Sequence, residues 1–130
     1  MIKTNCSFDK MVAVGDLQPN PRNPNRHPAK QIELLAKIIK AQGWRAPITV
    51  SNLSGLIVRG HGRYLAAQLL KVKKVPVDYQ DYDNDAQEWA DLVADNKIAE
   101  FAHLDADVTA QLIREIEATE ADIDMDITGF

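Results

Sequence analysis

Hydrophobic residues recur along the chain in short blocks, and their spacing predicts alternating strands and helices. Met11–Val14 is a short apolar run that is typical of a first strand. From Ala29 onwards apolar residues return every three or four positions, as they do on the buried face of a helix. This stripe consists of Ile32, Leu35, Ala36, Ile38 and Ile39. We therefore expect a helix from Ala29 that stops at Gly43, because glycine commonly follows the last helical turn.

The next block predicts a β-hairpin, a second helix and a further strand. Pro47–Val50 and Leu56–Val58 are apolar runs joined by a turn at Asn52–Gly55. A helix is expected over residues 60–70, followed by a strand at Val75–Tyr79. Strands that alternate with helices indicate a small α/β domain.

The last third of the chain predicts two acidic helices. The first covers Asp83–Ala102, and the second covers Ala106–Ala118 with Asp107 as its cap. The residues expected to face a core are Trp89, Leu92, Val93 and Ile98 in the first helix, and Val108, Leu112, Ile113 and Ile116 in the second. Residues 122–130 alternate acidic and apolar positions, a pattern of either a weak edge strand or a disordered acidic linker. The sequence thus divides into a domain over 1–104 and a C-terminal helix with an acidic tail over 105–130.

The segment between the first strand and the first helix is rich in proline and asparagine. Leu17–Pro28 contains four prolines and three asparagines. Proline removes backbone donors and restricts the preceding residue, so this segment is neither a regular helix nor a central strand. We expect a loop that carries Arg22, Arg26 and His27.

Composition narrows the class of protein. The chain has 130 residues, of which 45 % are hydrophobic and 26 % charged, as in a single soluble domain. Its one cysteine, Cys6, excludes an intramolecular disulfide framework and fits a reducing cytoplasm. No apolar run approaches the roughly 18 residues of a membrane span, so no membrane partner is expected.

Charge is distributed unevenly along the chain. Residues 1–74 hold 13 Lys and Arg against three acids, whereas residues 75–130 hold two basic residues against 16 acids. Such asymmetry is typical of proteins whose basic part faces nucleic acid or nucleotide. The alternative is that the two halves neutralise each other across the fold.

The segment Leu56–Ala67 carries the candidate chemistry. An apolar strand ends at a glycine-rich, cationic turn, and a helix follows at once. The free N–H groups of the first helical turn would converge there on one point, and Arg59, His61 and Arg63 would add side-chain donors. Two interpretations stay open at this stage, a phosphate-binding turn and an ordinary strand-to-helix loop with surface arginines.

Several motifs in this order resemble the ParB/sulfiredoxin superfamily. They are GWRAPITV at 43–50, GLIVRGHGRYLAAQLL at 55–70, VPVDY at 75–79 and ADNKIAEFA at 94–102. Over about residues 11–104 the chain looks most like the ParB-like nuclease-type domains of phage and mobile-element proteins. The resemblance implies an α/β (α+β) fold with a small mixed sheet and flanking helices, followed by an acidic helical segment.

The closing DIDMDITGF is similar to the segment that follows this domain in phage-type DNA modification methyltransferases. This likeness implies a C-terminal methyltransferase domain as a partner in a longer chain.

The resemblance also implies site residues. ParB proteins hold the triphosphate of CTP with a Gly-Glu-Arg-Arg box, of which Gly60 and Arg63 match, while His61 replaces the Glu and Gly62 the first Arg. Phosphate binding at the helix N-terminus survives these changes, whereas hydrolysis that depends on the glutamate does not follow from them. The implied phosphate or nucleotide ligands are Arg59, Gly60, His61, Gly62, Arg63, Tyr64 and Asn96. Arg22 and Arg26 on the proline-rich loop are either accessory contacts that close over this site or solvated surface charges.

A second ParB element, Glu-Asn, has its counterpart in Asp95–Lys97. This likeness implies Mg²⁺ at Asp95 and Asn96 beside a nucleoside triphosphate, CTP or ATP, because carboxylate and amide oxygens are hard ligands. The alternative is that Asp95 and Asn96 are solvated helix residues with Lys97 as their salt partner.

Three functions remain open from the sequence. The first is a module that binds nucleotide or DNA phosphate at Gly60–Arg63, in DNA modification or mobile-element biology. The second is a Mg²⁺-dependent nuclease, NTPase or small-molecule kinase that uses the same turn with Asp95 and Asn96. The third is a protein-interaction domain that docks through the acidic helices 83–118. The sequence leaves the oligomeric state open, a homodimer included.

Overall fold

The computed structural model describes residues 2–101 and 105–119, without the side chains of Asn96 and of residues 98–101. Its elements are β1 (Lys10–Ala13), a 3₁₀ turn η1 (Val14–Asp16), α1 (Ala29–Gln42), β2 (Ile48–Ser51), β3 (Ile57–Arg59), α2 (His61–Leu70), β4 (Lys74–Gln80), α3 (Asp85–Phe101) and α4 (Ala106–Ala118). The expected domain boundary at 104 and the alternating segment 122–130 lie outside the described residues. Among the described residues, no helix is long and apolar enough to cross a membrane.

The four strands form one mixed sheet in the order β1-β4-β2-β3. β2 and β3 are antiparallel, which confirms the expected hairpin, and β2 runs parallel to β4 with Ile48 opposite Val77. The parallel pair requires a crossover, and α2 provides it between β3 and β4. The observed fold is therefore the expected small α/β domain with a mixed sheet and flanking helices.

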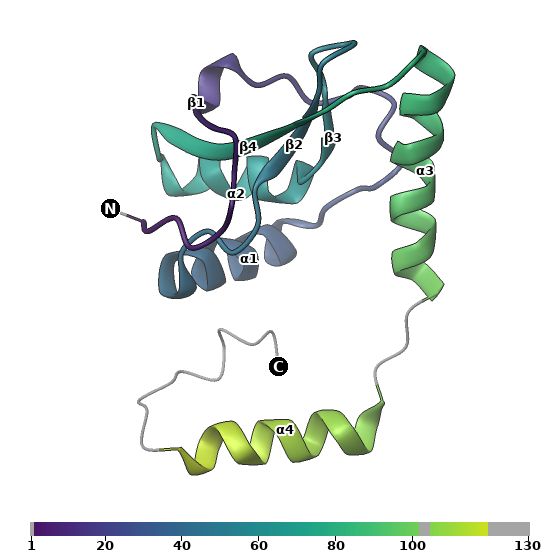
Figure 1. The fold of residues 1–130 in the computed structure, drawn as a ribbon. Helices are drawn as coiled ribbons and strands as arrows, with labels where there is room; N and C mark the ends of the chain where they lie inside the picture. The colour runs from purple at the N-terminus through teal and green to yellow at the C-terminus, as the bar shows by residue number, and fades with distance from the viewer. Residues whose placement is uncertain (1, 102–104, 120–130) are drawn as a thin grey trace.

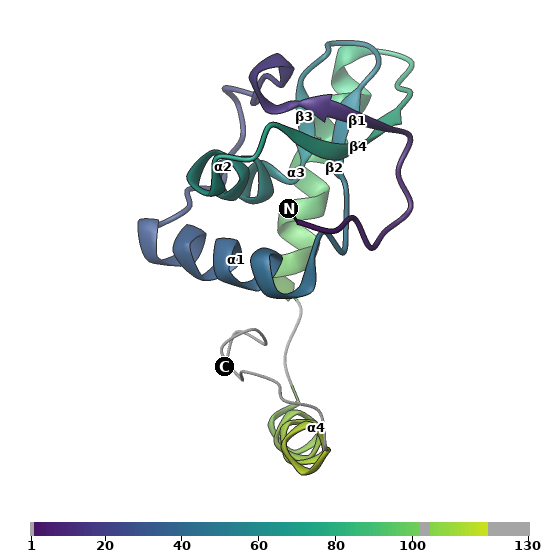
Figure 2. The same cartoon turned by 90° about the vertical axis from the view of Figure 1, so that its left-hand side faces the viewer.

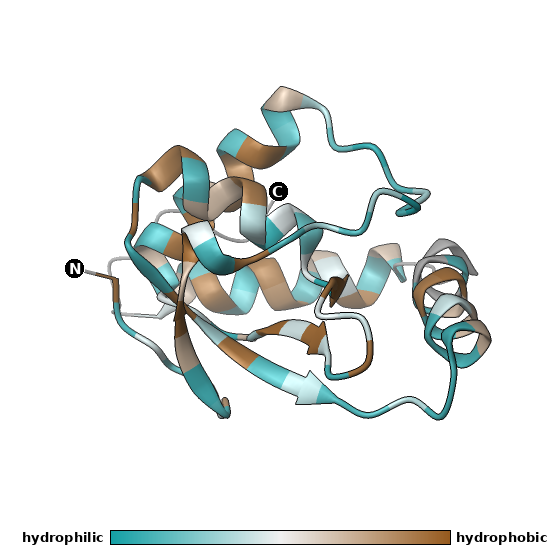
Figure 3. Ribbon diagram, turned by 90° about the horizontal axis from the view of Figure 1, so that it is seen from above, coloured by the Kyte–Doolittle hydropathy of each residue, from teal (hydrophilic) through white to brown (hydrophobic). Residues whose placement is uncertain are grey.

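Helices α1 and α2 lie on the same side of the sheet, and α3 stands beside β3 (Figures 1 and 2). The strands and these two helices share a buried apolar core, and hydrophobic residues occur along each of these elements (Figure 3). Burial of such apolar surface is the main stabilising contribution to the fold. The core contains Ile32, Ala36 and Ile39 from α1, Ile48 and Val50 from β2, Ala66 and Ala67 from α2, and Val75 and Val77 from β4.

The end of α1 is fixed by a glycine, as the sequence predicts. Gly43 has φ 77°, and a Cβ at this position would lie 2.6 Å from the carbonyl oxygen of Lys3. Only glycine combines this backbone conformation with so close an approach of another chain segment. The adjacent Trp44 is 2 % exposed and belongs to the core.

Helix α3 buries only part of the face that the sequence predicts. Leu92 is buried, as expected, whereas Trp89 and Val93 are exposed. Glu88, one helical turn before Leu92, is also buried. It accepts a hydrogen bond from the Ser54 hydroxyl at 2.9 Å, and its Oε1 has no partner in the described part of the chain. The prediction for Trp89 and Val93 was wrong because a polar residue with a partner on the β2–β3 hairpin lies on the inner face. The fourth expected core residue, Ile98, has a side chain outside the described residues.

Helix α4 has the expected length but neither the expected cap nor the expected burial. Asp105, not Asp107, is the N-cap, and its side chain accepts from the N–H groups of Asp107 and Val108 at 3.0 Å. None of its residues is buried, with Val108 63 % and Leu112 55 % exposed. In Figure 1 the helix lies apart from the α/β body, so its apolar stripe is not part of that core.

Candidate functional site

The glycine-rich turn joins β3 to α2 in the way the sequence predicts. Gly60 is the N-cap of α2 and adopts φ 92°, and a Cβ there would lie 3.3 Å from the Cα of Ile48. The first helical hydrogen bond runs from the N–H of Tyr64 to the carbonyl of Gly60 at 2.9 Å. The N–H groups of His61, Gly62 and Arg63 therefore have no carbonyl partner within the helix. A helix N-terminus of this kind favours an anion.

The residues of this turn line a hollow of about 240 Å³. Its walls come from the β3–α2 turn, from the proline- and asparagine-rich loop, from α1 and from α3. The lining residues are Asn23, Asn25, His27, Leu35, Val58, Arg59, Gly60, His61, Gly62, Arg63 and Asp95. We refer to this hollow as the turn pocket. It brings together five of the seven residues predicted from the sequence to bind phosphate, namely Arg59, Gly60, His61, Gly62 and Arg63.

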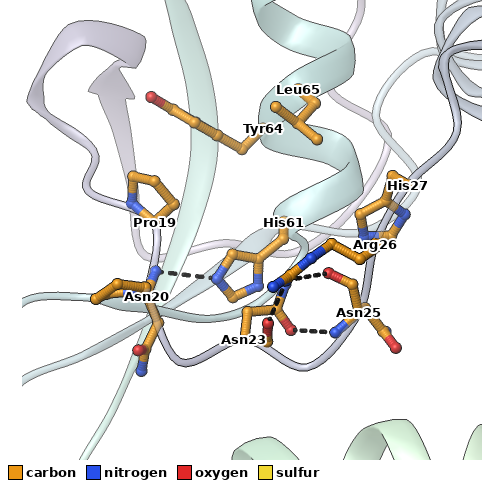
Figure 4. Close-up of a pocket in the computed structure, with 10 residues that line it drawn as sticks. Pro19, Asn20, Asn23, Asn25, Arg26, His27, His61, Tyr64 and Leu65 are labelled. Atoms are coloured by element: carbon orange, nitrogen blue, oxygen red, sulfur yellow. Dashed lines mark hydrogen bonds between the residues drawn. The ribbon is translucent and has the colours of Figure 1, made fainter.

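A second hollow, of about 300 Å³, lies next to the turn pocket and shares Asn23, Asn25, His27 and His61 with it. It is also lined by Pro19, Asn20, Pro21, Arg26, Tyr64 and Leu65, and Figure 4 shows these side chains around His61. We refer to it as the loop pocket. Tyr64 therefore belongs to this second hollow and not to the turn pocket.

His61 lies between the two pockets and anchors the loop. Its Nε2 accepts a hydrogen bond from the backbone N–H of Asn20 at 3.1 Å (Figure 4), and both residues are buried. Burial, with a smaller contribution from His27, lowers the pKa of His61 from 6.5 to about 4. The imidazole is therefore neutral at pH 7, and the nitrogen that meets Asn20 acts as an acceptor.

The asparagines of the proline- and asparagine-rich loop determine its conformation, and they were not predicted to be site residues. The Asn20 side chain accepts from the N–H of Arg22 at 2.9 Å, and its carbonyl accepts from the N–H of Asn23 at 3.0 Å. The guanidinium of Arg26 donates to the carbonyls of Asn23 and Asn25 at 3.0 and 3.4 Å. Alternating asparagine and proline is the signal that could have indicated such side-chain-to-backbone turns.

Arg59 has carboxylate partners on α3. Its Nη2 lies 2.8 Å from Asp91 Oδ1 and its Nε lies 3.6 Å from Asp95 Oδ1. The hydrogen bond from Arg59 to Asp91 is the largest cause that raises the pKa of the guanidinium. Asp91 also accepts from the Tyr82 hydroxyl, and burial together with this bond raises the pKa of Tyr82.

The Mg²⁺ site that the resemblance implies at Asp95 and Asn96 stays a prediction. Asp95, the described member of the expected pair, already has a guanidinium beside its carboxylate. The described part of the chain holds no group of three or more His, Cys, Asp or Glu side chains placed to bind a metal ion. The side chain of Asn96 lies outside the described residues, so we assign no metal ligand.

The other predicted cations occupy different places. Arg22 stacks over the ring of Trp89 at 4.5 Å from its centroid and lines neither pocket, whereas Arg26 lines the loop pocket. Arg63 lines the turn pocket and has no carboxylate within salt-bridge distance among the described residues. Arg63 is thus the cationic side chain of the turn pocket that is available to bind an anion.

Comparison with known proteins places this geometry in a family. Residues 3–96 match the model of the ParB N-terminal domain. The chain is 39 % identical over 62 residues to the ParB-like nuclease domain-containing protein YnaK of Escherichia coli K12, a match that covers 48 % of this chain and 70 % of YnaK.

Solved structures agree with this assignment. The chromosome-partitioning protein ParB from Caulobacter crescentus, truncated at its C-terminus and complexed with CTP-γ-S, matches with a TM-score of 0.68 and 26 % identity over 91 % of this chain and 69 % of that chain. The same protein complexed to the centromeric parS site matches with a TM-score of 0.57 and 24 % identity over 92 % and 65 %, which shows the fold alone. The match over residues 3–96, which contain both pockets and the β3–α2 turn, shows that the chain belongs to the ParB N-terminal domain family.

Proposed function

We propose that the chain binds a nucleotide, with a phosphate in the turn pocket and the nucleoside in the loop pocket. The observation that carries this proposal is the first turn of α2. His61, Gly62 and Arg63, the first three residues of the helix, line the turn pocket. Arg63 has no carboxylate partner among the described residues. Backbone donors and a free guanidinium form a recurrent arrangement for holding phosphate.

The family supports a nucleotide over an isolated phosphate. The ParB structure that is 26 % identical to this chain holds CTP-γ-S. In this chain the loop pocket adjoins the turn pocket through His61 and offers proline, tyrosine and leucine surfaces with asparagine amides at its edge. Apolar walls with a few placed polar groups are typical of sites for a base and a sugar.

Arg63→Ala tests the proposal most directly. Binding of CMP and CTP is measured by calorimetry, and melting temperature is followed with and without each nucleotide. Wild-type protein should bind and be stabilised by ligand, because a ligand that binds only the folded state raises its stability. Arg63→Ala should weaken binding about 10-fold or more, since a charge-assisted hydrogen bond to phosphate contributes about 1.5–3 kcal/mol.

Arg45→Ala is the matched control, since Arg45 is an exposed arginine that lines neither pocket. It should leave nucleotide affinity within about twofold of wild type. Equal losses in both variants would mean that the nucleotides respond to overall charge and not to the α2 turn. The absence of any binding to wild-type protein would exclude the proposal.

DNA phosphate is the other ligand that the same turn could hold, and a short single-stranded oligonucleotide is the probe for it. A contact with backbone phosphates should weaken as salt rises. The enzymatic alternative, a nuclease, NTPase or kinase, is tested in parallel by following cleaved DNA or released phosphate. Binding without turnover would favour the module over the enzyme.

A further inference from the structure

The turn pocket is lined both by the proline- and asparagine-rich loop, with three residues, and by Asp95 of α3. The loop and the helix also contact each other directly. Arg22 of the loop holds its guanidinium over the Trp89 ring of α3, 4.5 Å from the ring centroid. This cation–π contact joins two of the elements that form the walls of the pocket.

The loop is fixed more firmly at its start than where it meets α3. At its start the N–H of Asn20 donates to His61 Nε2 at 3.1 Å, and both residues are buried. By contrast, Arg22 is exposed and Trp89 is 40 % exposed. A cation–π contact at an exposed site is weak, because water competes for the cation. The contact at Arg22 therefore opens more readily than the hydrogen bond at Asn20.

Hydrogen bonds inside the loop hold residues 21–27 together as one segment, which we call the strap. The N–H of Asn23 donates to the Asn20 carbonyl at 3.0 Å, and the N–H of Asn25 donates to Asn23 Oδ1 at 3.3 Å. The Arg26 guanidinium donates to the Asn23 carbonyl at 3.0 Å. None of these three bonds involves α3, so the strap keeps them when it moves away from the helix.

We propose that the Arg22–Trp89 contact is a latch that holds the strap against α3 and controls the exchange of ligand at the turn pocket. This inference rests on the proposed nucleotide binding and adds the step by which the nucleotide enters and leaves. When the latch breaks, the strap swings about Asn20 and the pocket opens between the loop and α3.

The latch acts on the rates of binding and release and not on the affinity. Neither Arg22 nor Trp89 lines either pocket, so neither side chain contacts the bound ligand. If ligand passes only through the open form, a larger open fraction speeds association and release by the same factor. The dissociation constant, which is the ratio of the two rate constants, then stays the same.

Trp89→Leu tests the latch, because leucine keeps an apolar side chain but has no aromatic face. It also keeps the charge of Arg22, which by itself attracts an anion. Association and release of mant-labelled CTP are followed by stopped-flow fluorescence at constant ionic strength. Both rate constants should rise about two- to fivefold, the effect expected from loss of a weak contact, and the dissociation constant should stay within about twofold. Trp89→Phe, which restores an aromatic ring, should recover most of the wild-type rates.

The motion of the strap gives a second readout that needs no ligand. In Trp89→Leu, NMR relaxation of the backbone amides in residues 21–27 should report larger motion than in wild type. The Asn20 amide, which is bonded to His61, should not change. Val93→Ala is the matched control, since Val93 lies one helical turn beyond Trp89, is 56 % exposed and lines neither pocket. It should leave the rates and the motion of the strap unchanged.

The outcomes separate the latch from the nucleotide binding on which it rests. Unchanged strap motion in Trp89→Leu would overturn the latch itself, whether or not nucleotide binds. Equal release rates in wild type and Trp89→Leu would overturn its control of exchange and leave nucleotide binding intact. A 10-fold weaker affinity at an unchanged association rate would do the same, because it would show that Trp89 contacts the ligand. Failure of wild-type protein to bind any nucleotide would overturn the proposed function and the control of exchange together.

Discussion

His61 is the residue on which the geometry of the site depends most. Its buried imidazole accepts the N–H of Asn20, and through this bond it fixes the loop that walls both pockets. A protonated imidazole would present a donor to another donor and would also be a buried charge. The hydrogen bond between the Asn20 N–H and the His61 Nε2 therefore forms only while His61 is neutral.

The pH dependence of stability should report this anchor. In the unfolded chain His61 takes up a proton near pH 6.5, but in the folded chain it does so only near pH 4, because burial lowers its pKa. The unfolded state binds more protons between these two pH values. The contribution of His61 to the free energy of unfolding is therefore fully present above pH 6.5 and is lost as the pH drops toward 4. The expected slope from this residue is about 1.4 kcal/mol per pH unit.

Urea denaturation of wild type and His61→Gln between pH 7.5 and 4 measures the slope. Glutamine offers an acceptor to Asn20 but does not titrate, so the variant should lose the part of the slope that belongs to His61. His27→Gln should keep most of it, since the charge of His27 is the smaller cause of the lowered pKa. Identical pH profiles for wild type and His61→Gln would show that the anchor does not titrate.

For individual residues, the members of the β3–α2 turn could be predicted from the sequence, but their interaction partners could not. Gly60 and Arg63 could be assigned to the turn because their positions follow from the strand and helix that flank it. The pairing of Arg59 with Asp91 could not be predicted, since it depends on how α3 rotates about its axis. For the same reason Arg22, expected near phosphate, contacts Trp89.

At the scale of elements, the β3–α2 turn depends on one glycine. Gly60 has φ 92°, and a Cβ there would approach Ile48 to 3.3 Å. Gly60→Ala should lower the free energy of unfolding by about 1–3 kcal/mol, because a residue with a side chain is strained in this region. Urea denaturation measures the loss.

Gly15→Ala is the control for this substitution, since Gly15 has no positive φ and a Cβ there would meet nothing within 4 Å. It should change stability by less than about 0.5 kcal/mol. A Gly60→Ala variant as stable as Gly15→Ala would mean that the turn adopts another conformation. The N–H groups at the start of α2 would then not have the orientation that the proposed phosphate binding requires, because this turn sets their direction.

For elements that bury an apolar face, both the residue range and the buried face could be predicted from the sequence. For the other elements, only the residue range could be predicted. The stripe of α1 and the hairpin β2–β3 follow from apolar spacing. In α1 the expected Ile32, Ala36 and Ile39 lie in the core and Leu35 packs against it, whereas Ile38 is only half-buried. In α3 the apolar Trp89 and Val93 point outward, because the Glu88–Ser54 hydrogen bond and the Arg59–Asp91 pair fix the opposite face. Periodicity alone carries no information about such polar partners.

At the scale of the whole molecule, residues 1–101 and residues 105–130 differ in net charge. Residues 1–101 contain 14 Lys and Arg against 11 Asp and Glu, whereas residues 105–130 contain one arginine against eight acids. The four-stranded sheet, the core and both pockets lie within residues 1–101. The acidic segment therefore lowers the net charge of the protein, and its described residues, 105–119, line neither pocket.

Truncation after Phe101 separates these two contributions. No residue of α4 is buried, and Val108 and Leu112 of its apolar stripe are more than half exposed, so removal of 102–130 should change the melting temperature by less than about 3 °C. The formal charge should change from −4 to +3, which follows from the residue counts. The truncated protein should therefore elute from heparin at higher salt than the full chain, because a positive protein binds a polyanion more tightly.

Calorimetry of nucleotide binding completes the test: an unchanged dissociation constant for CMP would place the whole site in residues 1–101. A fall in melting temperature of 10 °C or more would instead show that the apolar stripe of α4 packs against the α/β body.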